Sequence, residues 1–408
     1  MWSEAFVMHD KMRHGLVLFV LIPFLMLAVC GFCLGNRTGD TKNGTDIAQD
    51  AVNEVLLEKQ EEELLAAMSL EQKIAQMFIV TPESLTDGAN LTTADGAMRA
   101  GMQLYPVGGL VYFSKNLTDA GQTKEMLRCT QEFSLEIQGL PLFLCVDEEG
   151  GRVARIGNNK GFDVPKVGPM GNIASKEAAH EAGSKVGRYL RELGFNLDFA
   201  PDADVLTNNK NTVIGNRSFG SDAQTVLQYA RAYSDGLHEN GVLSTFKHFP
   251  GHGATEADTH EGFAYTDKTY EELMQAELLP FAGAGEAGID CVMVSHIAVP
   301  NITRDNVPCT LSYRMTGEIL RGDLGYDGII VTDAMNMGAV TQNYSSDEAA
   351  VAAVKAGVDM ILMPEDFHLA VQGVRNAVQN GEISEERIDE SVRRIIKVKL
   401  GKLMGNTL

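Results

Sequence analysis

Val242-Leu-Ser-Thr-Phe246 runs directly into Lys247-His-Phe-Pro-Gly-His-Gly-Ala-Thr-Glu-Ala-Asp-Thr-His260, and this junction determines how the rest of the chain is interpreted. The first segment is short and largely apolar, as a buried strand is. The second holds three histidines, one lysine, two acids and two glycines in fourteen residues. Ionisable side chains are rarely buried without partners, and glycine gains backbone freedom at the expense of side-chain contacts. The junction therefore predicts a strand that leads into an active-site loop, with a solvated surface loop as the alternative.

Seven further apolar runs resemble the one before this loop. The eight runs are Ala75–Val80, Gly109–Phe113, Leu142–Val146, Phe195–Ala200, Leu243–Phe246, Cys291–Ser295, Gly328–Thr332 and Met360–Met363. Helical patterns lie between or after them at Asp119–Gln138, Ser175–Leu193, Asp222–Asn240, Tyr270–Ala287, Asp347–Ala356, Phe367–Gln379 and Glu382–Leu403. Buried strands that alternate with helices are typical of a (β/α)₈ barrel. We predict a TIM-like (β/α)₈ barrel over residues 69–408, with an open doubly wound sheet as the alternative because periodicity alone does not show closure.

Length and charge limit the classes of partner. The chain has 408 residues, which suits one large α/β barrel plus an additional segment. Its 34 basic and 55 acidic residues give a net charge of −21, which leaves no basic field to meet nucleic-acid phosphates. The six cysteines form no CxxC motif in the globular part, so they predict no disulfide framework and no metal site. We expect a neutral small-molecule substrate and no nucleic-acid partner.

The N-terminal residues have the pattern of a targeting segment. Lys11 and Arg13 precede Leu16–Leu34, which contains no charged residue. Basic residues before such an apolar run indicate an export signal or an uncleaved membrane anchor with the remainder outside. The Leu27-Ala-Val-Cys30 tetrad resembles a bacterial lipobox, although Val29 stands where a small residue is expected. We predict a signal peptide or membrane anchor at 1–35 and a tether with an acidic helix at 36–68. The protein would then be anchored, or held as a lipoprotein, on the outer face of a bacterial cytoplasmic membrane, with secretion as the alternative.

Polar residues directly follow five of the eight apolar runs. They are Asp147-Glu-Glu-Gly-Gly-Arg152, Pro201-Asp-Ala-Asp204, Lys247-His248, Ser295-His296 and Thr332-Asp333. In α/β barrels the carboxyl ends of the strands share one rim, and the chemistry takes place there. We therefore expect these side chains to converge on one active site.

Several chemistries are compatible with these residues. Asp333 can serve as a nucleophile, an electrostatic stabiliser or a metal ligand. Asp258 and His260 suit acid–base work, because the carboxylate can orient the imidazole and raise its basicity. The charged and hydrogen-bonding groups of Asp147, Arg155 and Arg217 suit a substrate with many hydroxyl groups. Lys247 and His248 are fixed at a strand end, so they suit binding of those hydroxyls better than a role that requires movement.

Two rival chemistries remain open at this point. A metal could be held by His248, His252, Asp258, His260 and His296, but none of their spacings is specific for zinc. A Schiff base on Lys247 would need a lowered lysine pKa, and neighbouring acids act in the opposite direction.

Three motifs carry a resemblance to a known family. They are Val146-Asp-Glu-Glu-Gly-Gly-Arg-Val153, Lys247-His-Phe-Pro-Gly-His-Gly253 followed by Asp258-Thr-His260, and Gly328-Ile-Ile-Val-Thr-Asp-Ala-Met335. Together they resemble the family-3 glycoside hydrolases, and within them the β-N-acetylglucosaminidase branch, from about Ser69 to the C-terminus. The resemblance implies a TIM-like barrel and a retaining exo-hydrolase that acts on terminal β-linked N-acetylglucosamine through a covalent glycosyl-enzyme. It implies no metal and no organic cofactor.

The resemblance also implies a role for individual residues. Asp333 would be the nucleophile, His260 the general acid/base and Asp258 its orienting partner. The residues implied to hold the sugar are Asp147, Arg155, Arg217, Lys247 and His248. Neither His252 nor His296 receives a role.

The N-terminal segment and the implied activity together point to cell-wall (peptidoglycan) fragments as the substrate, with the leaving group unassigned. The alternatives are a family-3 β-glucosidase or glycoside phosphorylase on the same barrel, a metal-dependent barrel hydrolase and a non-catalytic sugar-binding protein.

Overall fold

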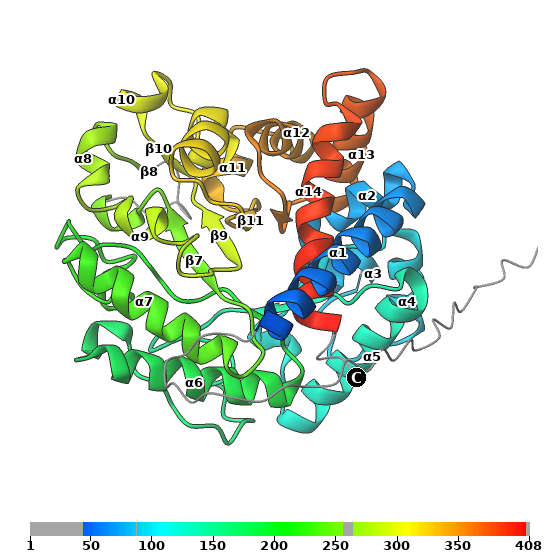
Figure 1. Ribbon diagram of the computed structural model, residues 1–408, viewed down its shortest axis with the longest axis horizontal. Helices are drawn as coiled ribbons and strands as arrows, with labels where there is room; N and C mark the ends of the chain where they lie inside the picture. The colour runs from blue at the N-terminus through cyan, green and yellow to red at the C-terminus, as the bar shows by residue number, and fades with distance from the viewer. Residues whose placement is uncertain (1–43, 87, 256–263, 405–408) are drawn as a thin grey trace, which may run out of the picture. The chain divides into compact units, whose positions relative to one another are not determined.

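The computed structural model describes residues 44–86, 88–255 and 264–404 (Figure 1). The segment predicted as a signal peptide or membrane anchor, residues 1–35, lies outside these ranges, as do Asp258 and His260 of the predicted acid/base pair. Among the described helices, none is both long enough and apolar enough to cross a membrane. Contacts divide the chain after Asp50, and the site described below belongs entirely to the unit that starts at Ala51.

Parallel strands form at all eight predicted apolar runs. They are β1 (Phe78–Val80), β2 (Gly109–Val111), β3 (Phe143–Val146), β6 (Leu197–Asp198), β7 (Thr245–Phe249), β9 (Cys291–Val294), β11 (Ile329–Thr332) and β12 (Ile361–Leu362). Five of them pair in the order β12-β1-β2-β3-β6, and the other three in the order β11-β9-β7. Isolated parallel bridges, Leu197 to Leu243 and Val331 to Met360, connect the two sheets at both junctions. Every residue of these strands is buried, as expected for parallel strands covered on both faces.

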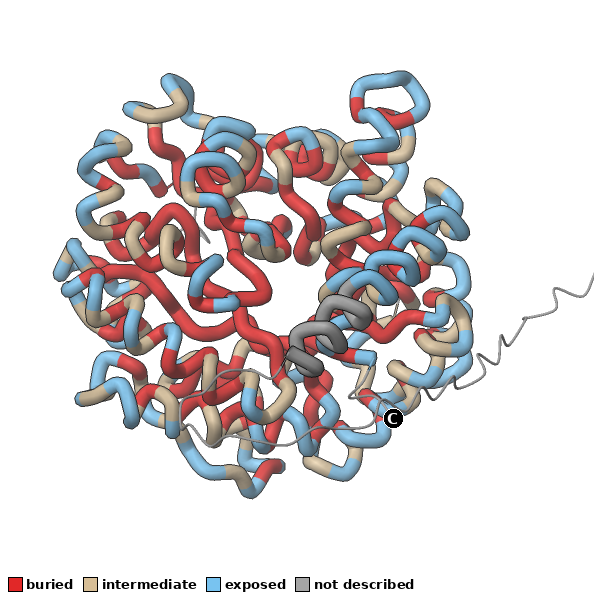
Figure 2. Tube along the Cα trace, in the orientation of Figure 1, coloured by how far each residue is buried: buried red, intermediate tan, exposed pale blue. Residues whose placement is uncertain are grey.

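The long helices begin and end where local sequence signals place them. The principal ones are α5 (Ala120–Gln138), α6 (Lys176–Leu193), α7 (Ala223–His238), α12 (Ser346–Ala356) and α13 (Phe367–Gln379). The side chains of Asp119, Ser175 and Asp222 accept hydrogen bonds from the first turns of α5, α6 and α7. Gly139 and Gly194 end α5 and α6 in the left-handed conformation that glycine adopts without strain. In Figure 1 β7, β9 and β11 lie inside helices that include these five, and Figure 2 shows buried strands inside and exposed outer helix surfaces.

The other helices, turns and strands complete the described chain. The remaining helices and turns are α1 (Gly44–Ala67), α2 (Leu70–Gln76), α3 (Pro82–Thr86), α4 (Gly96–Leu104), η1 (Ser114–Asn116), η2 (Met170–Asn172), η3 (Gly215–Arg217), η4 (His252–Ala254), α8 (Tyr270–Met274), α9 (Leu279–Ala282), α10 (Pro300–Thr303), η5 (Cys309–Leu311), η6 (Arg314–Asp323), α11 (Gly338–Thr341), α14 (Glu385–Val398) and η7 (Lys399–Leu403). The remaining strands are β4 (Glu148–Gly150), β5 (Val153–Ala154), β8 (Ala264–Tyr265) and β10 (Ile297–Ala298).

Two helix predictions need correction. The prediction of one helix over Tyr270–Ala287 is wrong, because the structure has α8 and α9 with a break between them. Pro280 lies in the first turn of α9, where its missing N–H is tolerated, so a new helix starts there instead of the old one continuing. The helix predicted over Glu382–Leu403 starts later, and its last residues form a π-helical turn, η7. The ten-residue helix η6 was not predicted, since Gly317 and Gly322 weaken its helical pattern.

Candidate active site

A cavity of about 260 Å³ lies at the carboxyl ends of the parallel strands. Its wall contains the predicted nucleophile and all five residues predicted to hold the sugar: Asp333, Asp147, Arg155, Arg217, Lys247 and His248. Apolar side chains, among them Phe113, Met293 and Met337, complete the wall. Three of the five polar groups that follow strands thus supply residues to this wall, whereas Pro201–Asp204 and Ser295-His296 are not among its lining residues.

Asp333 follows β11 and is held in an ionised state. Its Oδ1 accepts a hydrogen bond of 2.8 Å from the Ala334 N–H. Burial raises the pKa of this carboxyl group, but the imidazoles of His248 and His296, the Ala334 N–H and the Lys247 ammonium outweigh burial and hold that pKa below its ordinary value. Asp333 is therefore a carboxylate at neutral pH, as a nucleophile or electrostatic stabiliser must be.

Lys247 and His248 lie within strand β7, whereas the sequence pattern placed them just after its end. The pairing of β7 with β9 shifts register between Lys247 and Phe249. Successive side chains on a regular strand point to opposite faces, and an irregularity of this kind redirects one of them. Both Lys247 and His248 consequently line the cavity.

Asp147 joins two of the cavity's cations. The Lys247 ammonium donates to Asp147 Oδ1 at 3.1 Å, and the Arg155 guanidinium donates to Oδ2 at 3.3 Å. Arg155 also lies over the Phe113 ring, 5.5 Å from its centroid. The β4–β5 hairpin brings Arg155 back beside Asp147, since the Arg155 N–H donates to the Asp147 carbonyl. Asp147, Lys247 and Arg155 thus form a charged edge of the cavity suited to hydroxyl groups.

Glu149 is a cavity residue for which the sequence predicted no role. It was visible only as part of the acidic run Asp147-Glu148-Glu149 after the third apolar run. Its carboxylate accepts two hydrogen bonds of 2.8 Å from Arg217 and lies 2.6 Å from the Lys247 ammonium. Which member of an acidic run meets which cation depends on the hairpin, and no local pattern reveals it.

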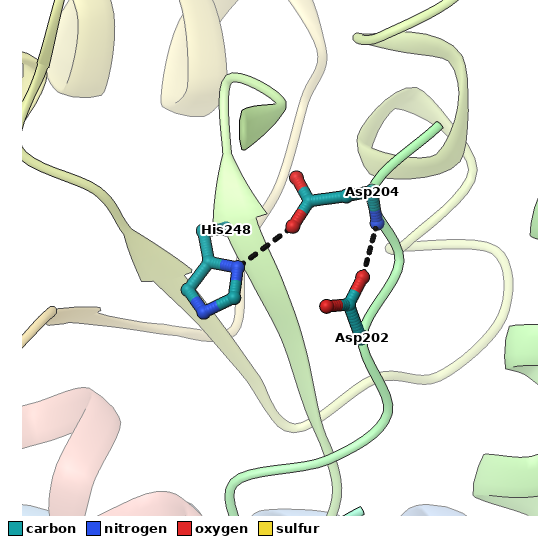
Figure 3. Close-up of side chains that lie close together, drawn as sticks. All are labelled: Asp202, Asp204 and His248. Carbon is teal, nitrogen blue, oxygen red and sulfur yellow. Dashed lines mark hydrogen bonds and ion pairs between the residues drawn. The ribbon is translucent and has the colours of Figure 1, made fainter. Parts of the chain in front are cut away.

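His248 is oriented by Asp204, a second residue that received no role from the sequence. Asp204 Oδ2 accepts a hydrogen bond of 2.7 Å from His248 Nδ1, and Asp202 accepts one of 3.0 Å from the Asp204 N–H (Figure 3). Arg217 Nη2 lies 3.3 Å from His248 Nε2. A guanidinium can only donate, so Nε2 accepts and His248 carries its proton on Nδ1.

The cluster of Asp202, Asp204 and His248 has ligand atoms within 4.8 Å of one another, a spacing that a metal ion could use. Arg217 already contacts two of these groups, with Nε at 3.5 Å from Asp202 and Nη2 beside His248. A metal ion would have to compete with this guanidinium for the same atoms. The donor set is therefore better described as a buried ion-pair network than as a metal site.

The two histidines without an assigned role lie beside residues of the cavity or of this network. His252 is buried, its backbone N–H donates to Asp204, and its ring lies edge-on to His248 at 6.0 Å. His296 is also buried, and its Nε2 lies 3.0 Å from the Ala334 carbonyl, next to Asp333. Both histidines thus contact the backbone or side chains that fix cavity residues.

Asp258 and His260 belong to residues 256–263, outside the described part of the chain. Their role as orienting partner and general acid/base stays a prediction.

Comparison with known proteins identifies the family to which this chain belongs. The model of the glycosyl hydrolase family 3 N terminal domain matches residues 69–398, and the chain belongs to this family.

Individual relatives give the comparison more detail. Beta-hexosaminidase A of Pseudoalteromonas piscicida is 31% identical over 335 residues, which are 76% of this chain and 56% of that protein. Beta-hexosaminidase LpqI of Mycobacterium tuberculosis is 31% identical over 345 residues, which are 82% of this chain and 84% of that protein. The structure of a family 3 β-N-acetylglucosaminidase from Paenibacillus sp. str. FPU-7 superimposes with a TM-score of 0.77 at 37% identity, over 82% of this chain and 63% of that one.

Proposed function

We propose that this protein is a retaining exo-β-N-acetylglucosaminidase that hydrolyses terminal β-linked N-acetylglucosamine. One observation carries the proposal: the ionised carboxylate of Asp333 faces a cavity whose wall holds paired cations and carboxylates suited to one sugar ring. The choice of N-acetylglucosamine over glucose is supported by the names of the relatives, which are hexosaminidases and an N-acetylglucosaminidase.

The mechanism has two displacements at the anomeric carbon. Asp333 attacks that carbon while the bond to the leaving oxygen breaks, and His260 donates the proton that this oxygen needs. Water then attacks the glycosyl-enzyme, gives a proton to His260 and releases Asp333, so the anomeric configuration is retained. A histidine suits this role because it is neutral after donating its proton and does not repel a leaving group that carries an acidic substituent, while Asp258 favours the imidazolium that must form first.

The proposed scaffold is a single closed (β/α)₈ barrel formed by the two parallel sheets. The bridges from Leu197 to Leu243 and from Val331 to Met360 support closure, because they join both ends of the five-stranded sheet to the three-stranded one. Closure would explain why strand ends from all parts of the chain meet at one cavity.

The proposed location is outside the cell, at the membrane, with peptidoglycan fragments as the substrate. The support is the basic and apolar pattern of Lys11, Arg13 and Leu16–Leu34. Fractionation of cells that express the full chain should place it in the membrane pellet, and recovery in the cytosol would contradict this location.

Hydrolysis is favoured over phosphorolysis by the charges of the cavity. Lys247 and Arg217 are each already paired with a carboxylate, so an incoming phosphate would meet Asp147 and Glu149 as well as these cations. Turnover should therefore proceed at the same rate whether or not phosphate is present.

The test is release of nitrophenol from 4-nitrophenyl N-acetyl-β-glucosaminide by the full chain. The wild type should turn over, and Asp333→Ala should lower kcat/KM by about 10⁴-fold with an unchanged Tm. A folded wild type that releases nothing would refute the proposal. Turnover that a chelator abolishes and zinc restores would favour the metal-dependent alternative, and saturable sugar binding without turnover would favour the sugar-binding alternative.

A further inference from the structure

We propose that Glu149 is a positioning residue that fixes the Lys247 ammonium and the Arg217 guanidinium at the wall of the sugar cavity. The inference rests on the proposed function and adds a residue to it that acts through these two cations.

The geometry gives one carboxylate two cationic partners. Arg217 donates to Glu149 with Nε to Oε2 and Nη2 to Oε1, both at 2.8 Å, which is the fork geometry that a guanidinium forms with a carboxylate. The Lys247 ammonium lies 2.6 Å from Oε1. Glu149 is therefore the bridge between two strand-end cations that belong to different parts of the chain.

All three charged groups are removed from water. The side chains of Glu149, Lys247 and Arg217 are 2%, 3% and 12% exposed. Buried charges are tolerated when they are paired and hydrogen-bonded, and loss of one partner leaves the others uncompensated. Arg217 and Lys247 outweigh the effect of burial and hold the pKa of Glu149 far below its ordinary value, so Glu149 is fully ionised.

The neighbouring acids cannot replace Glu149. Asp202 lies 3.5 Å from Arg217 Nε, but burial and the adjacent Asp204 raise its pKa well above its ordinary value, so Asp202 is a weak partner for a cation. Asp147 reaches Lys247 but is shared with Arg155. Glu149 is thus the principal ionised partner of Arg217.

The three consecutive acids Asp147, Glu148 and Glu149 make different contacts at the β4–β5 hairpin. Asp147 faces the cavity from the end of β3. Glu148 accepts hydrogen bonds from the Ile156 and Gly157 N–H groups and from the Tyr189 hydroxyl, which anchors the hairpin. Glu149, the next residue, points to the cations. Glu148 thus anchors the hairpin, and Glu149, the next residue, positions the cations.

The test compares Glu149→Gln with the wild type on 4-nitrophenyl N-acetyl-β-glucosaminide. The variant keeps the shape of the side chain and removes its charge, so kcat/KM should fall about 10-fold to 100-fold, as for other residues that orient a binding group. The side chains that set the charge state of Lys247 are Asp147, Glu149 and Arg217, with Asp198 and Asp333 nearby.

The pH dependence of kcat/KM distinguishes a loss of positioning from a loss of folding. Glu149 and Asp147 raise the pKa of Lys247 against the effect of burial. Without Glu149 this pKa falls, so the alkaline limb that follows deprotonation of Lys247, above the one at which His260 loses its proton, should move to lower pH. Glu149→Asp, which keeps the charge at a shorter reach, should restore part of the activity and the position of this limb. It also serves as the test variant if Glu149→Gln fails to fold.

Asp359→Asn is the matched control. Asp359 is fully buried and also holds two cations, Arg321 and Arg394, but it precedes β12 and does not line the cavity. This variant should lose stability with no shift of the pH profile. The inference is overturned if Glu149→Gln keeps the wild-type kcat/KM and pH profile, or changes only its Tm as the control does.

A second readout keeps the inference independent of turnover. N-acetylglucosamine affinity, measured by calorimetry, should fall in Glu149→Gln relative to the wild type and stay constant in Asp359→Asn. An inactive wild type with this binding pattern refutes the proposed hydrolase and supports the positioning role. Equal affinities of wild type and Glu149→Gln refute the positioning role.

Discussion

At the scale of single residues, the cavity combines ions that are individually costly to bury. Asp333 is kept ionised by donors and cations around it, and Asp147 and Glu149 balance Lys247, Arg155 and Arg217. The sequence predicted which residue types follow the strands, because polar groups after apolar runs are a local signal. It did not predict the roles of Glu149 and Asp204, since their partners lie 44 to 98 positions away or depend on a hairpin.

The predicted acid/base role of His260 has a test at this scale. His260→Ala should lose about 10²-fold or more in kcat on a glucosaminide with a poor leaving group, because that oxygen needs a proton as its bond breaks. A nitrophenyl leaving group needs little protonation and should lose much less. Measuring kcat for a series of aryl leaving groups checks this difference, and equal losses across the series would contradict an acid role.

At the scale of elements, apolar runs and capping residues located most of the strands and long helices. The errors arose where local patterns are ambiguous. Pro280 inside an otherwise helical pattern starts a new helix, α9, and β7 continues through Lys247 and His248 with a shift of register against β9. The other seven parallel strands are shorter than predicted, because the apolar pattern extends beyond the paired residues.

The C-terminal turn η7 contains a buried lysine that is not among the residues lining the cavity. Lys399 is fully buried, donates to Gln76 Oε1 at 2.8 Å and lies 5.2 Å from the centroid of the Phe143 ring. Burial lowers the pKa of Lys399 from 10.5 to about 7. Between these two values the unfolded chain binds more protons than the folded one, so this group makes stability rise with pH across that window.

Replacing this lysine should remove that pH dependence. Lys399→Met has no proton to bind, so the rise in the free energy of unfolding between pH 7 and pH 10 should be smaller than in the wild type, by on the order of a few kcal/mol. The loss of the Gln76 hydrogen bond is the same at every pH and does not affect this slope. Urea unfolding at a series of pH values measures it, and an unchanged slope would contradict a neutral buried Lys399.

At the scale of the whole molecule, the alternation of strands and helices and three short motifs predicted both the α/β class and the family. The cavity itself was predicted only as a convergence of strand ends. Its volume, its apolar wall at Met293 and Met337, and its ion-pair network depend on contacts between distant strands. The proposed preference for an acetamido group over a hydroxyl follows least from local pattern and most from the names of the relatives.

One comparison tests the central claim most directly. The full chain is assayed for kcat/KM on 4-nitrophenyl N-acetyl-β-glucosaminide and on 4-nitrophenyl β-glucoside under identical conditions. We predict a preference of about 10²-fold or more for the N-acetylglucosaminide, because a site built to bind the acetamido group leaves polar groups unpaired with the glucoside. Equal rates, or a preference for the glucoside, would contradict the assignment as an N-acetylglucosaminidase.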